Sequence, residues 1–310
     1  MKRIEAFGPF ALPSAAVPVA VPSPAGELSG LLAGPSASSL VDGVCAASSP
    51  RACQIGANRV LLVPGYTGSK EDYAPVLPFL GGAGWDVLAY SQRGQGGSAA
   101  PPGLGAYGMS DFVGDLVSIA EAWAGKTGRV HLVGHSFGGI VARAAVVARP
   151  ELFASLTLFC SGRAAYEWMH TLPILDPLPV GEGARERVLR AYFPDMNLAE
   201  PTVGWAEFQR VRALATSSEN LVGIARILVQ LRPDTAALAA TGVPVHVVYG
   251  DRDQTWPPSW YAAEAWDLGA RESVIRGGGH SPQMQYPEEW ARHVGGFWGD
   301  VDTGALVWSV

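Results

Sequence analysis

The sequence predicts an α/β fold in which a mostly parallel β-sheet carries helices on both faces. Short apolar runs alternate with segments of helical spacing over the first half of the chain, and strand-like runs return near its end. This alternation is typical of β-α-β units. Between the two parts, residues 163–232 offer helical patterns but no convincing strand. We therefore expect a core made of residues 1–162 and 233–310, with residues 163–232 inserted as a helical cap.

Composition limits the classes of function that the chain can have. Of its 310 residues 48% are hydrophobic and 16% are charged, so it can bury a sizeable core and does not resemble a disordered chain. The net charge is −6 and no Lys/Arg block stands out, which disfavours a nucleic-acid partner because its phosphates would be repelled. The sequence contains no run of about 18 apolar residues, so it predicts no membrane span. The oligomeric state does not follow from the sequence.

The N-terminus and the cysteines bear on whether the protein is exported. Met1, Lys2 and Arg3 resemble the start of a signal peptide, but Glu5 and four prolines interrupt the apolar segment that would follow, so we expect an extended arm. Cys45 and Cys53 lie in a loop rich in Ser, Ala and Gly and could pair if the protein is exported, whereas the third cysteine, in an apolar run, is expected to be a buried thiol. We expect a cytoplasmic location and leave export open.

The elements of the core follow from periodicity and from turn residues. Buried strands are compact apolar runs bounded by Gly or Pro, and helices show apolar residues three and four positions apart. The expected strands are a pair around a turn within Val17–Leu32, then Arg59–Val63, Trp85–Tyr90, Val130–Val133, Ser155–Cys160, Val243–Tyr249 and Glu272–Ile275. The expected helices are Asp72–Leu80, Met109–Trp123 with Ser110 as its N-cap, Gly138–Ala148 and Pro287–Trp298. The apolar tail, Gly304–Val310, is expected to be an arm on the surface.

A candidate nucleophile lies in the run Gly134-His135-Ser136-Phe137-Gly138, which matches G-x-S-x-G. A strand precedes it and a helix of small residues follows it, which is the context that this motif requires. The serine of such a turn adopts unfavourable backbone angles, and glycines two positions away on each side leave room for helix and strand to pack closely. Its hydroxyl is a weak nucleophile at neutral pH and needs an adjacent base.

The base and its orienting acid are expected in the C-terminal quarter. His280 follows three glycines in a loop after the last strand, where it can reach across the carboxyl edge of the sheet. Asp253 clears the end of the strand that finishes at Gly250 and can point toward His280, whereas Asp251 is expected to cap the turn or pair with Arg252. A serine, a histidine and an acid in these roles form a catalytic triad.

On these residues the chain resembles the α/β-hydrolase fold superfamily over nearly its whole length, and the triad order Ser136, Asp253, His280 is the order of that fold. The resemblance implies an eight-stranded type of sheet and a serine esterase with an inserted cap. It also implies that Val63-Pro64-Gly65-Tyr66 forms the oxyanion loop and that the backbone N–H groups of Tyr66 and Phe137 stabilise the oxyanion. Loss of one such donor typically costs about 3–4 kcal/mol of barrier lowering.

Two positions depart from the pattern of the family. Members often carry His before the oxyanion-loop glycine, where this chain has Pro64, and many show D-x-R-G-x-G-x-S where this chain reads Ser91-Gln92-Arg93-Gly94-Gln95-Gly96-Gly97-Ser98. Neither change touches the triad, but both bear on the loops that line the pocket. The resemblance is thus to the broad family and not to one subfamily.

The expected reaction is hydrolysis of a carboxylic ester or related acyl compound, with a small and apolar acyl substrate as partner. The same triad also serves cleavage of C–C bonds, lactones, amides or thioesters, and acyl transfer, so these alternatives stay open. A non-catalytic small-molecule binder on the same fold is the remote alternative. No cofactor and no metal are expected, because neither a cluster of zinc ligands nor a glycine-rich nucleotide fingerprint is present in the sequence.

Large apolar residues in and near the expected cap have two interpretations of equal weight. They either line a substrate pocket or pack the cap onto the core. The residues concerned are Trp168, Met169, Trp205, Phe208, Ile224 and Trp256.

Overall fold

The computed structural model describes residues 1–37, 58–125, 128–232 and 234–305. Cys45 and Cys53, which could pair if the protein is exported, lie outside these residues, as does most of the apolar tail after Gly304. In the described part of the chain none of the helices combines the length and the apolar character that crossing a bilayer requires.

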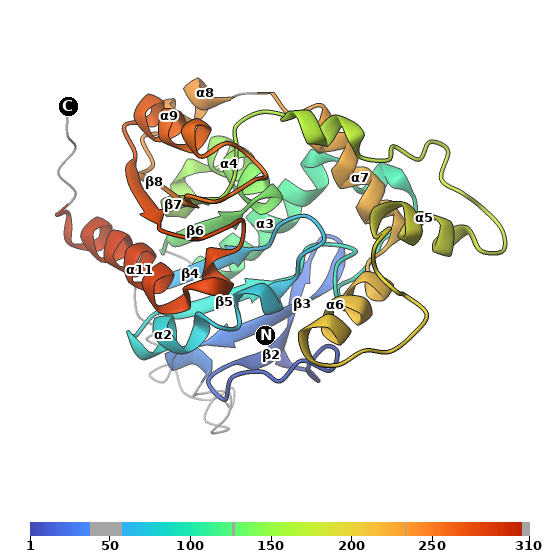
Figure 1. Cartoon of the computed structure of the whole chain (residues 1–310). Coiled ribbons are helices and arrows are strands. Elements are labelled where there is room, and N and C mark those ends of the chain that lie inside the picture. Colours follow the sequence, from blue (N-terminus) through green and yellow to red (C-terminus); the bar gives the residue numbers. More distant parts are fainter. Residues whose placement is uncertain (38–57, 126–127, 233, 306–310) are drawn as a thin grey trace.

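A nine-stranded sheet forms the centre of the described structure, with strand order β1-β2-β3-β5-β4-β6-β7-β8-β9 (Figure 1). β1, β2 and β3 run antiparallel to their neighbours, and all pairs from β5 to β9 are parallel. The mostly parallel α/β fold is therefore confirmed, and the two-residue β1 is an addition at one edge of the expected eight strands. The strands are β1 (Lys2–Arg3), β2 (Val17–Ser23), β3 (Gly26–Ala33), β4 (Arg59–Val63), β5 (Asp86–Tyr90), β6 (Val130–His135), β7 (Phe153–Phe159), β8 (Val245–Gly250) and β9 (Arg271–Ile275).

Helices cover both faces of the sheet. α3, α4, α8 and α9 pack together on one face, and α2 and α11 contact each other on the other face (Figure 1). The central strands β4, β6 and β7 are buried on both faces, which explains why they read as continuous apolar runs in the sequence. These helices are α2 (Leu77–Gly82), α3 (Met109–Ala124), α4 (Phe137–Ala148), α8 (Thr235–Ala240), α9 (Pro258–Leu268), α10 (Pro282–Gln285) and α11 (Pro287–Thr303), of which α10 precedes α11 directly.

Two details of the expected elements are wrong. The expected helix Asp72–Leu80 is a 3₁₀ helix, η1 (Lys70–Tyr73), followed by α2, because Pro75 has no N–H to continue the first helix. The N-cap of α3 is Gly108 and not Ser110, since Gly108 N donates to the Asp111 carboxylate at 3.0 Å. Other boundaries shift by one to five residues, and the largest shift lengthens α11 beyond Trp298 to Thr303.

Residues 163–232, all of them described, form helices and turns without a strand. Their elements are η4 (Glu167–Thr171), α5 (Ala184–Tyr192), α6 (Gly204–Ala215) and α7 (Ser218–Val229), and Figure 1 shows α5, α6 and α7 grouped at the side of the molecule away from α11. The apolar face of α7 is buried, and it is formed by Leu221, Ile224, Ala225 and Leu228. We propose that this segment is a cap on the core.

The N-terminal arm ties α6 to the core. The Phe10 ring lies 5.3 Å from the Trp205 ring and 5.2 Å from the Phe208 ring, both on α6. Arg212, also on α6, forms a 2.5 Å ion pair with Asp72 of η1. These contacts position α6 beside the loop that follows β4.

Candidate active site

Ser136 occupies the turn between β6 and α4. Its φ of 54° and ψ of −120° lie outside the regions that L-residues normally adopt. The Ser136 N–H donates to the Phe159 carbonyl oxygen at 2.9 Å, so the sheet holds the strained residue in place. Because α4 begins at Phe137, the N-terminus of this helix faces the same point as the serine.

The flanking glycines are required by close backbone contacts. A Cβ added to Gly134 would lie 2.4 Å from Gly139 Cα, and one added to Gly138 would lie 2.3 Å from the Val63 carbonyl oxygen. No side chain fits at such distances, so α4 can approach β4 and β6 only because these positions lack a Cβ. The sequence pattern around Ser136 is thus a consequence of packing.

His280 and Asp253 meet at the carboxyl edge of the sheet. His280 Nδ1 lies 2.9 Å from Asp253 Oδ2 and 3.0 Å from Oδ1. The Asp253 carboxylate also accepts hydrogen bonds from the Thr255 N–H at 2.8 Å and from the Tyr261 hydroxyl at 2.8 Å. Because Nδ1 donates to the carboxylate, Nε2 is the ring nitrogen of His280 that can accept a proton.

The electrostatics keep Asp253 ionised. Burial raises the pKa of Asp253, but the hydrogen bond and charge of His280, together with the bonds from Thr255 and Tyr261, bring this pKa below its ordinary value. Burial raises the pKa of Tyr261 well above its usual range, with Cys160 and Asp253 adding to the effect, so its hydroxyl stays a donor. A buried carboxylate with three donors is suited to fix and charge-stabilise a histidine.

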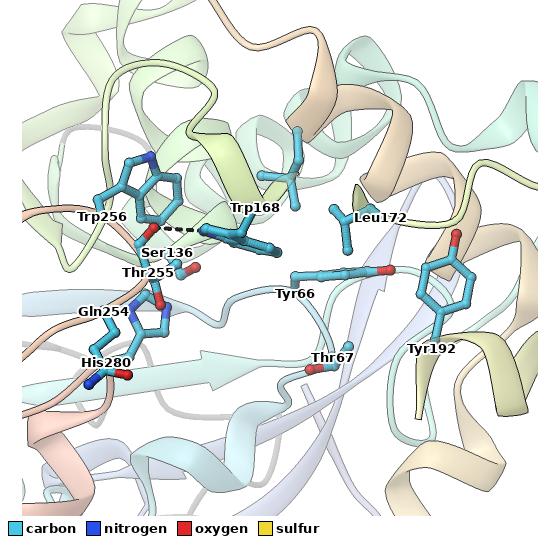
Figure 2. A pocket seen from close by; sticks show the side chains of 11 residues that line it. Tyr66, Thr67, Ser136, Trp168, Leu172, Tyr192, Gln254, Thr255, Trp256 and His280 are labelled. Atoms are coloured by element: carbon cyan, nitrogen blue, oxygen red, sulfur yellow. Dashed lines mark hydrogen bonds between the residues drawn. The ribbon is translucent and has the colours of Figure 1, made fainter. Parts of the chain in front are cut away.

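Ser136 and His280 line one cavity of about 430 Å³ (Figure 2). Ser136 is 7% exposed and the His280 side chain 29% exposed, so both side chains are reachable from that space. Asp253 lies behind His280, with a fully buried side chain. The structure therefore brings the three residues predicted from the sequence to one place.

The loop after β4 lies against Ser136, as an oxyanion loop would. A Cβ added to Gly65 would come within 2.9 Å of Ser136 Cβ. In the described part of the chain the backbone N–H groups of Tyr66 and Phe137 make no hydrogen bond, so both remain able to donate to a ligand. These are the two amides that the resemblance assigned to the oxyanion.

Three side chains that the sequence interpretation missed hold the carbonyl groups of this loop. The Tyr73 hydroxyl donates to Val63 O at 2.8 Å. Gln92 Nε2 donates to Pro64 O, and Gln95 Nε2 donates to Gly65 O, each at 2.9 Å. The two glutamines belong to the segment that departs from the family pattern, and that departure was the available signal. Gly65 O and the Tyr66 N–H belong to one planar peptide group, so the bond from Gln95 fixes the direction of that amide.

His135, the neighbour of the nucleophile, supports the base. Its Nε2 lies 2.7 Å from the backbone carbonyl oxygen of His280, and the two rings are 4.9 Å apart. Burial, with a smaller contribution from the charge of His280, lowers the pKa of His135 to about 4, so its ring is neutral at physiological pH. A neutral ring that donates through Nε2 positions the loop of His280 without adding a second charge.

Asp251 bonds to the backbone of the loop before His280, and Cys160 lies close to Asp253 and His280. Asp251 accepts a hydrogen bond from the Gly277 N–H at 2.6 Å, so it caps a turn as expected, but its ion pair is with Arg276 at 3.6 Å and not with Arg252. Among the described residues, Cys160, Asp253 and His280 place one ligand atom each within 4.8 Å of one another. Burial raises the pKa of the Cys160 thiol well above its usual range, and His280 Nδ1 is already bonded to Asp253, so this donor set does not favour a metal.

The large apolar residues divide between the two interpretations. Trp168 and Trp256 line the cavity, and the Trp168 indole N–H is fixed by a 2.7 Å bond to the Thr255 carbonyl (Figure 2). Met169, Phe208 and Ile224 are fully buried, and Trp205 stacks on Phe208 at 5.0 Å. These four pack and do not line the cavity. The full lining is Tyr66, Thr67, Ser136, Trp168, Leu172, Tyr192, Leu228, Gln254, Thr255, Trp256 and His280.

The chain matches a family model and is similar to several known proteins. A family model described as "Alpha/beta hydrolase family" matches residues 60–293. A protein of Variovorax paradoxus named "Putative carbamate hydrolase RutD" is 43% identical over 99 residues, which cover 32% of this chain and 36% of that protein. Epoxide hydrolase A of Mycobacterium tuberculosis is 35% identical over 86 residues, which cover 28% of this chain and 26% of that protein.

These two curated relatives are matched over only 36% and 26% of their own length. Among solved structures, a hydrolase from Pseudomonas aeruginosa superposes with a TM-score of 0.67 at 22% sequence identity, covering 91% of this chain and 98% of that chain. This likeness shows the fold. The matched stretch of the family model contains Ser136, Asp253 and His280.

Proposed function

The chain belongs to the alpha/beta hydrolase family, and we propose that it cleaves a carboxylic ester or related acyl compound through an acyl-enzyme on Ser136. The observation that carries this proposal is the Asp253–His280 pair, at 2.9 Å, beside a serine held in a strained turn that opens into the same cavity. An inert turn serine would need neither the strain nor the buried carboxylate behind the histidine.

In the proposed first half-reaction Ser136 Oγ attacks the acyl carbon and its proton moves to His280 Nε2. The negative charge that develops on the carbonyl oxygen is held by the N–H groups of Tyr66 and Phe137. Asp253 stabilises the imidazolium that forms and does not take the proton itself. The tetrahedral intermediate collapses, the bond to the leaving group breaks, and His280 returns the proton to the leaving alcohol or its equivalent.

In the second half-reaction water replaces the alcohol. His280 accepts a proton from the water as its oxygen attacks the acyl-enzyme, and the same two amides hold the second oxyanion. Collapse breaks the ester bond to Ser136, whose oxygen regains the proton from His280. The products are a carboxylic acid and the unchanged enzyme, so no oxidant, metal or cofactor enters the balance.

The same triad would serve amide, thioester, lactone, carbamate or C–C cleavage, and an alcohol in place of water would make the reaction an acyl transfer. The apolar side chains of Trp168, Leu172 and Leu228 in the cavity favour an apolar acyl group. Epoxide chemistry through an ester intermediate would need a carboxylate where Ser136 stands.

A panel of p-nitrophenyl esters, thioesters, carbamates and anilides tests this proposal, with product analysis in the presence and absence of an alcohol. Ser136→Ala is expected to lower kcat by about 10⁶-fold on every compound that the wild type turns over. Ser110→Ala is the matched control, because Ser110 is an exposed residue of α3. Equal rates for wild type and Ser136→Ala would contradict the proposal.

A further inference from the structure

Strained backbone gathers at the candidate site. In the described part of the chain, the non-glycine residues with a positive φ are Thr67, Ser136 and Cys160. Ser136 is the proposed nucleophile. Cys160 lies beside Asp253 and His280, and Thr67 lines the same cavity as Ser136. Such strain persists only where the surrounding structure enforces it, and it is common at catalytic and binding sites. The strain at Thr67 therefore calls for a function.

Thr67 occupies the third position of a β-turn in the oxyanion loop. The Gly68 N–H closes this turn by donating to Gly65 O at 3.2 Å, and Gln95 Nε2 donates to the same oxygen at 2.9 Å. The φ of Thr67 is 58°. Glycine or asparagine is usual where a turn requires a positive φ, and a β-branched side chain is disfavoured there. Glycine would relieve the strain, so we expect the threonine side chain to contribute something that glycine lacks.

The hydroxyl of Thr67 is available to a ligand. Thr67 is half-buried, and its hydroxyl makes no hydrogen bond with any other described residue. Figure 2 shows this side chain below the Tyr66 ring, with its oxygen turned to the side of the view that holds Ser136 and His280. A hydroxyl can both donate and accept a hydrogen bond. The cavity beside the nucleophile therefore contains a polar group whose bonding capacity the protein itself does not use.

Two other polar side chains of the cavity wall carry a weaker case. Gln254 is exposed to solvent. The N–H of Thr255 donates to Asp253, and its carbonyl oxygen accepts from the Trp168 indole, so these two bonds account for its place in the wall. Thr67 differs from both because it is half-buried and because its conformation is costly. A few placed polar groups in a largely apolar pocket are what fix the orientation of a ligand.

The place of this hydroxyl follows from the amide beside it, because the Tyr66 N–H is proposed to hold the oxyanion. Consecutive Cα atoms are about 3.8 Å apart, so a hydroxyl one residue farther along can meet a substrate atom about two to four bonds from the reacting carbonyl carbon. We propose that Thr67 is a specificity-determining residue whose hydroxyl donates a hydrogen bond to an ether, hydroxyl or keto oxygen at that place in the substrate. This inference rests on the proposed acyl-enzyme chemistry at Ser136 and adds the substrate class, an otherwise apolar ester with a further oxygen near its carbonyl.

The test uses two pairs of esters in which one CH₂ group is exchanged for an oxygen. p-Nitrophenyl methoxyacetate and p-nitrophenyl butyrate place the oxygen on the acyl side, and ethoxyethyl butyrate and pentyl butyrate place it on the alcohol side. The measured quantity is the kcat/KM of each ether ester divided by that of its carbon counterpart. Thr67→Val keeps the branched Cβ and removes the hydroxyl, so this ratio is expected to fall about fivefold in one pair, the effect of one net hydrogen bond. Thr67→Ser is expected to keep the wild-type ratio, and the pair that responds identifies the side of the substrate that Thr67 binds.

Thr303→Val is the matched control, because it removes a hydroxyl from an exposed position of α11, and it is expected to keep both ratios. Hydrolysis of p-nitrophenyl butyrate by the wild type, and its loss in Ser136→Ala, report the proposed function alone. If that hydrolysis occurs while Thr67→Val keeps both wild-type ratios, the role of Thr67 is wrong and the proposed function stands. If the wild type hydrolyses none of the four esters, the proposed function fails and the role of Thr67 fails with it. Should Thr67→Val not fold, unchanged ratios in Thr67→Ala overturn the role of Thr67.

Discussion

Ser136 shows how a single residue can carry both strain and function. A non-glycine residue with a φ of 54° costs on the order of 1–3 kcal/mol, which the surrounding structure must offset. Here the offset comes from the sheet bond to Phe159 and from close packing that only Gly134 and Gly138 permit. The nucleophile could be predicted from the sequence because the close packing of this turn requires Gly134 and Gly138, and these two glycines make the G-x-S-x-G pattern around Ser136.

The identity of the acid is testable at this scale. Asp253→Asn removes the negative charge behind His280 and favours the wrong tautomer, so kcat is expected to fall by about 10⁴-fold while the fold is retained. Steady-state kinetics on the ester that the wild type turns over best, with circular dichroism as a check of folding, measures this.

Asp251→Asn is the matched control for that variant. Asp251 sits two residues away but bonds to Gly277 and Arg276 instead of His280. Its substitution is expected to change kcat by less than about tenfold. A larger loss in Asp251→Asn than in Asp253→Asn would exchange the roles that we assign to the two carboxylates.

Other residues of the site were not predictable one by one. Tyr261 reaches Asp253 from α9, and His135 reaches the His280 carbonyl across 145 positions of sequence. Both are residue types with many ordinary structural roles. Tyr261 stands in no distinctive local pattern, and His135 occupies a position of G-x-S-x-G at which the motif fixes no residue type. Only the register of the parallel strands, which aligns the ends of β6, β7 and β8, brings them together.

At the scale of elements, the contact between α4 and the oxyanion loop is the feature on which the site depends. Gly138→Ala would place a methyl group 2.3 Å from Val63 O and 2.6 Å from Pro64 O, and both are backbone atoms that cannot move aside cheaply. We expect a loss of about 1–3 kcal/mol in the free energy of unfolding. Urea unfolding followed by circular dichroism measures this loss.

Gly114→Ala gives the opposite sign within the same experiment. Gly114 lies inside α3 with nothing within 4 Å of an added Cβ, so alanine is expected to stabilise the protein by about 0.5–1 kcal/mol. If both substitutions stabilise, α4 does not pack on the loop as closely as described, and the account of the nucleophile turn is wrong.

Strands were easier to predict than helix ends. Buried parallel strands such as β4 are continuous apolar runs, and Pro or Gly marks their ends. The helix near Asp72 was predicted too long because its apolar spacing continues through Pro75, where the missing N–H outweighs the pattern. The cap of α3 was misplaced because Ser, Gly and Asp within one short run are all good candidates, and only the Asp111 hydrogen bond decides among them.

For the whole molecule, buried histidines predict how stability depends on pH. Burial, with smaller contributions from Arg271 and His293, lowers the pKa of His246 from 6.5 to about 3. Between these two values the unfolded chain holds a proton that the folded protein lacks, so the free energy of unfolding falls as the pH falls below 6.5. Each such histidine contributes a slope of about 1.4 kcal/mol per pH unit.

His246→Gln is therefore expected to reduce the slope of unfolding free energy against pH by about 1.4 kcal/mol per unit between pH 5.5 and 4.5. Urea unfolding at several pH values in this range measures the slope for both proteins. A slope identical to that of the wild type would mean that His246 is protonated in the folded state, against the burial seen on β8.

The assembly of the N-terminal arm with α6 lay beyond sequence reasoning. Phe10, Trp205 and Phe208 come from segments about 200 positions apart, and aromatic residues at helical spacing suit a pocket and a packed interface equally well. The structure resolves that choice for Trp205 and Phe208 in favour of packing. The same limit applies to the cavity beside Ser136, whose shape depends on how the helices of residues 163–232 lie on the core.

The central claim is that Ser136 is an activated nucleophile, and intact-mass analysis after treatment with an ethyl fluorophosphonate tests it most directly. The wild type is expected to gain the mass of one ethyl phosphonyl group, with the proton of Ser136 and the fluoride leaving together as HF, and Ser136→Ala is expected to gain none. A folded wild type that stays unmodified, or a Ser136→Ala variant that is modified to the same extent, would contradict the account.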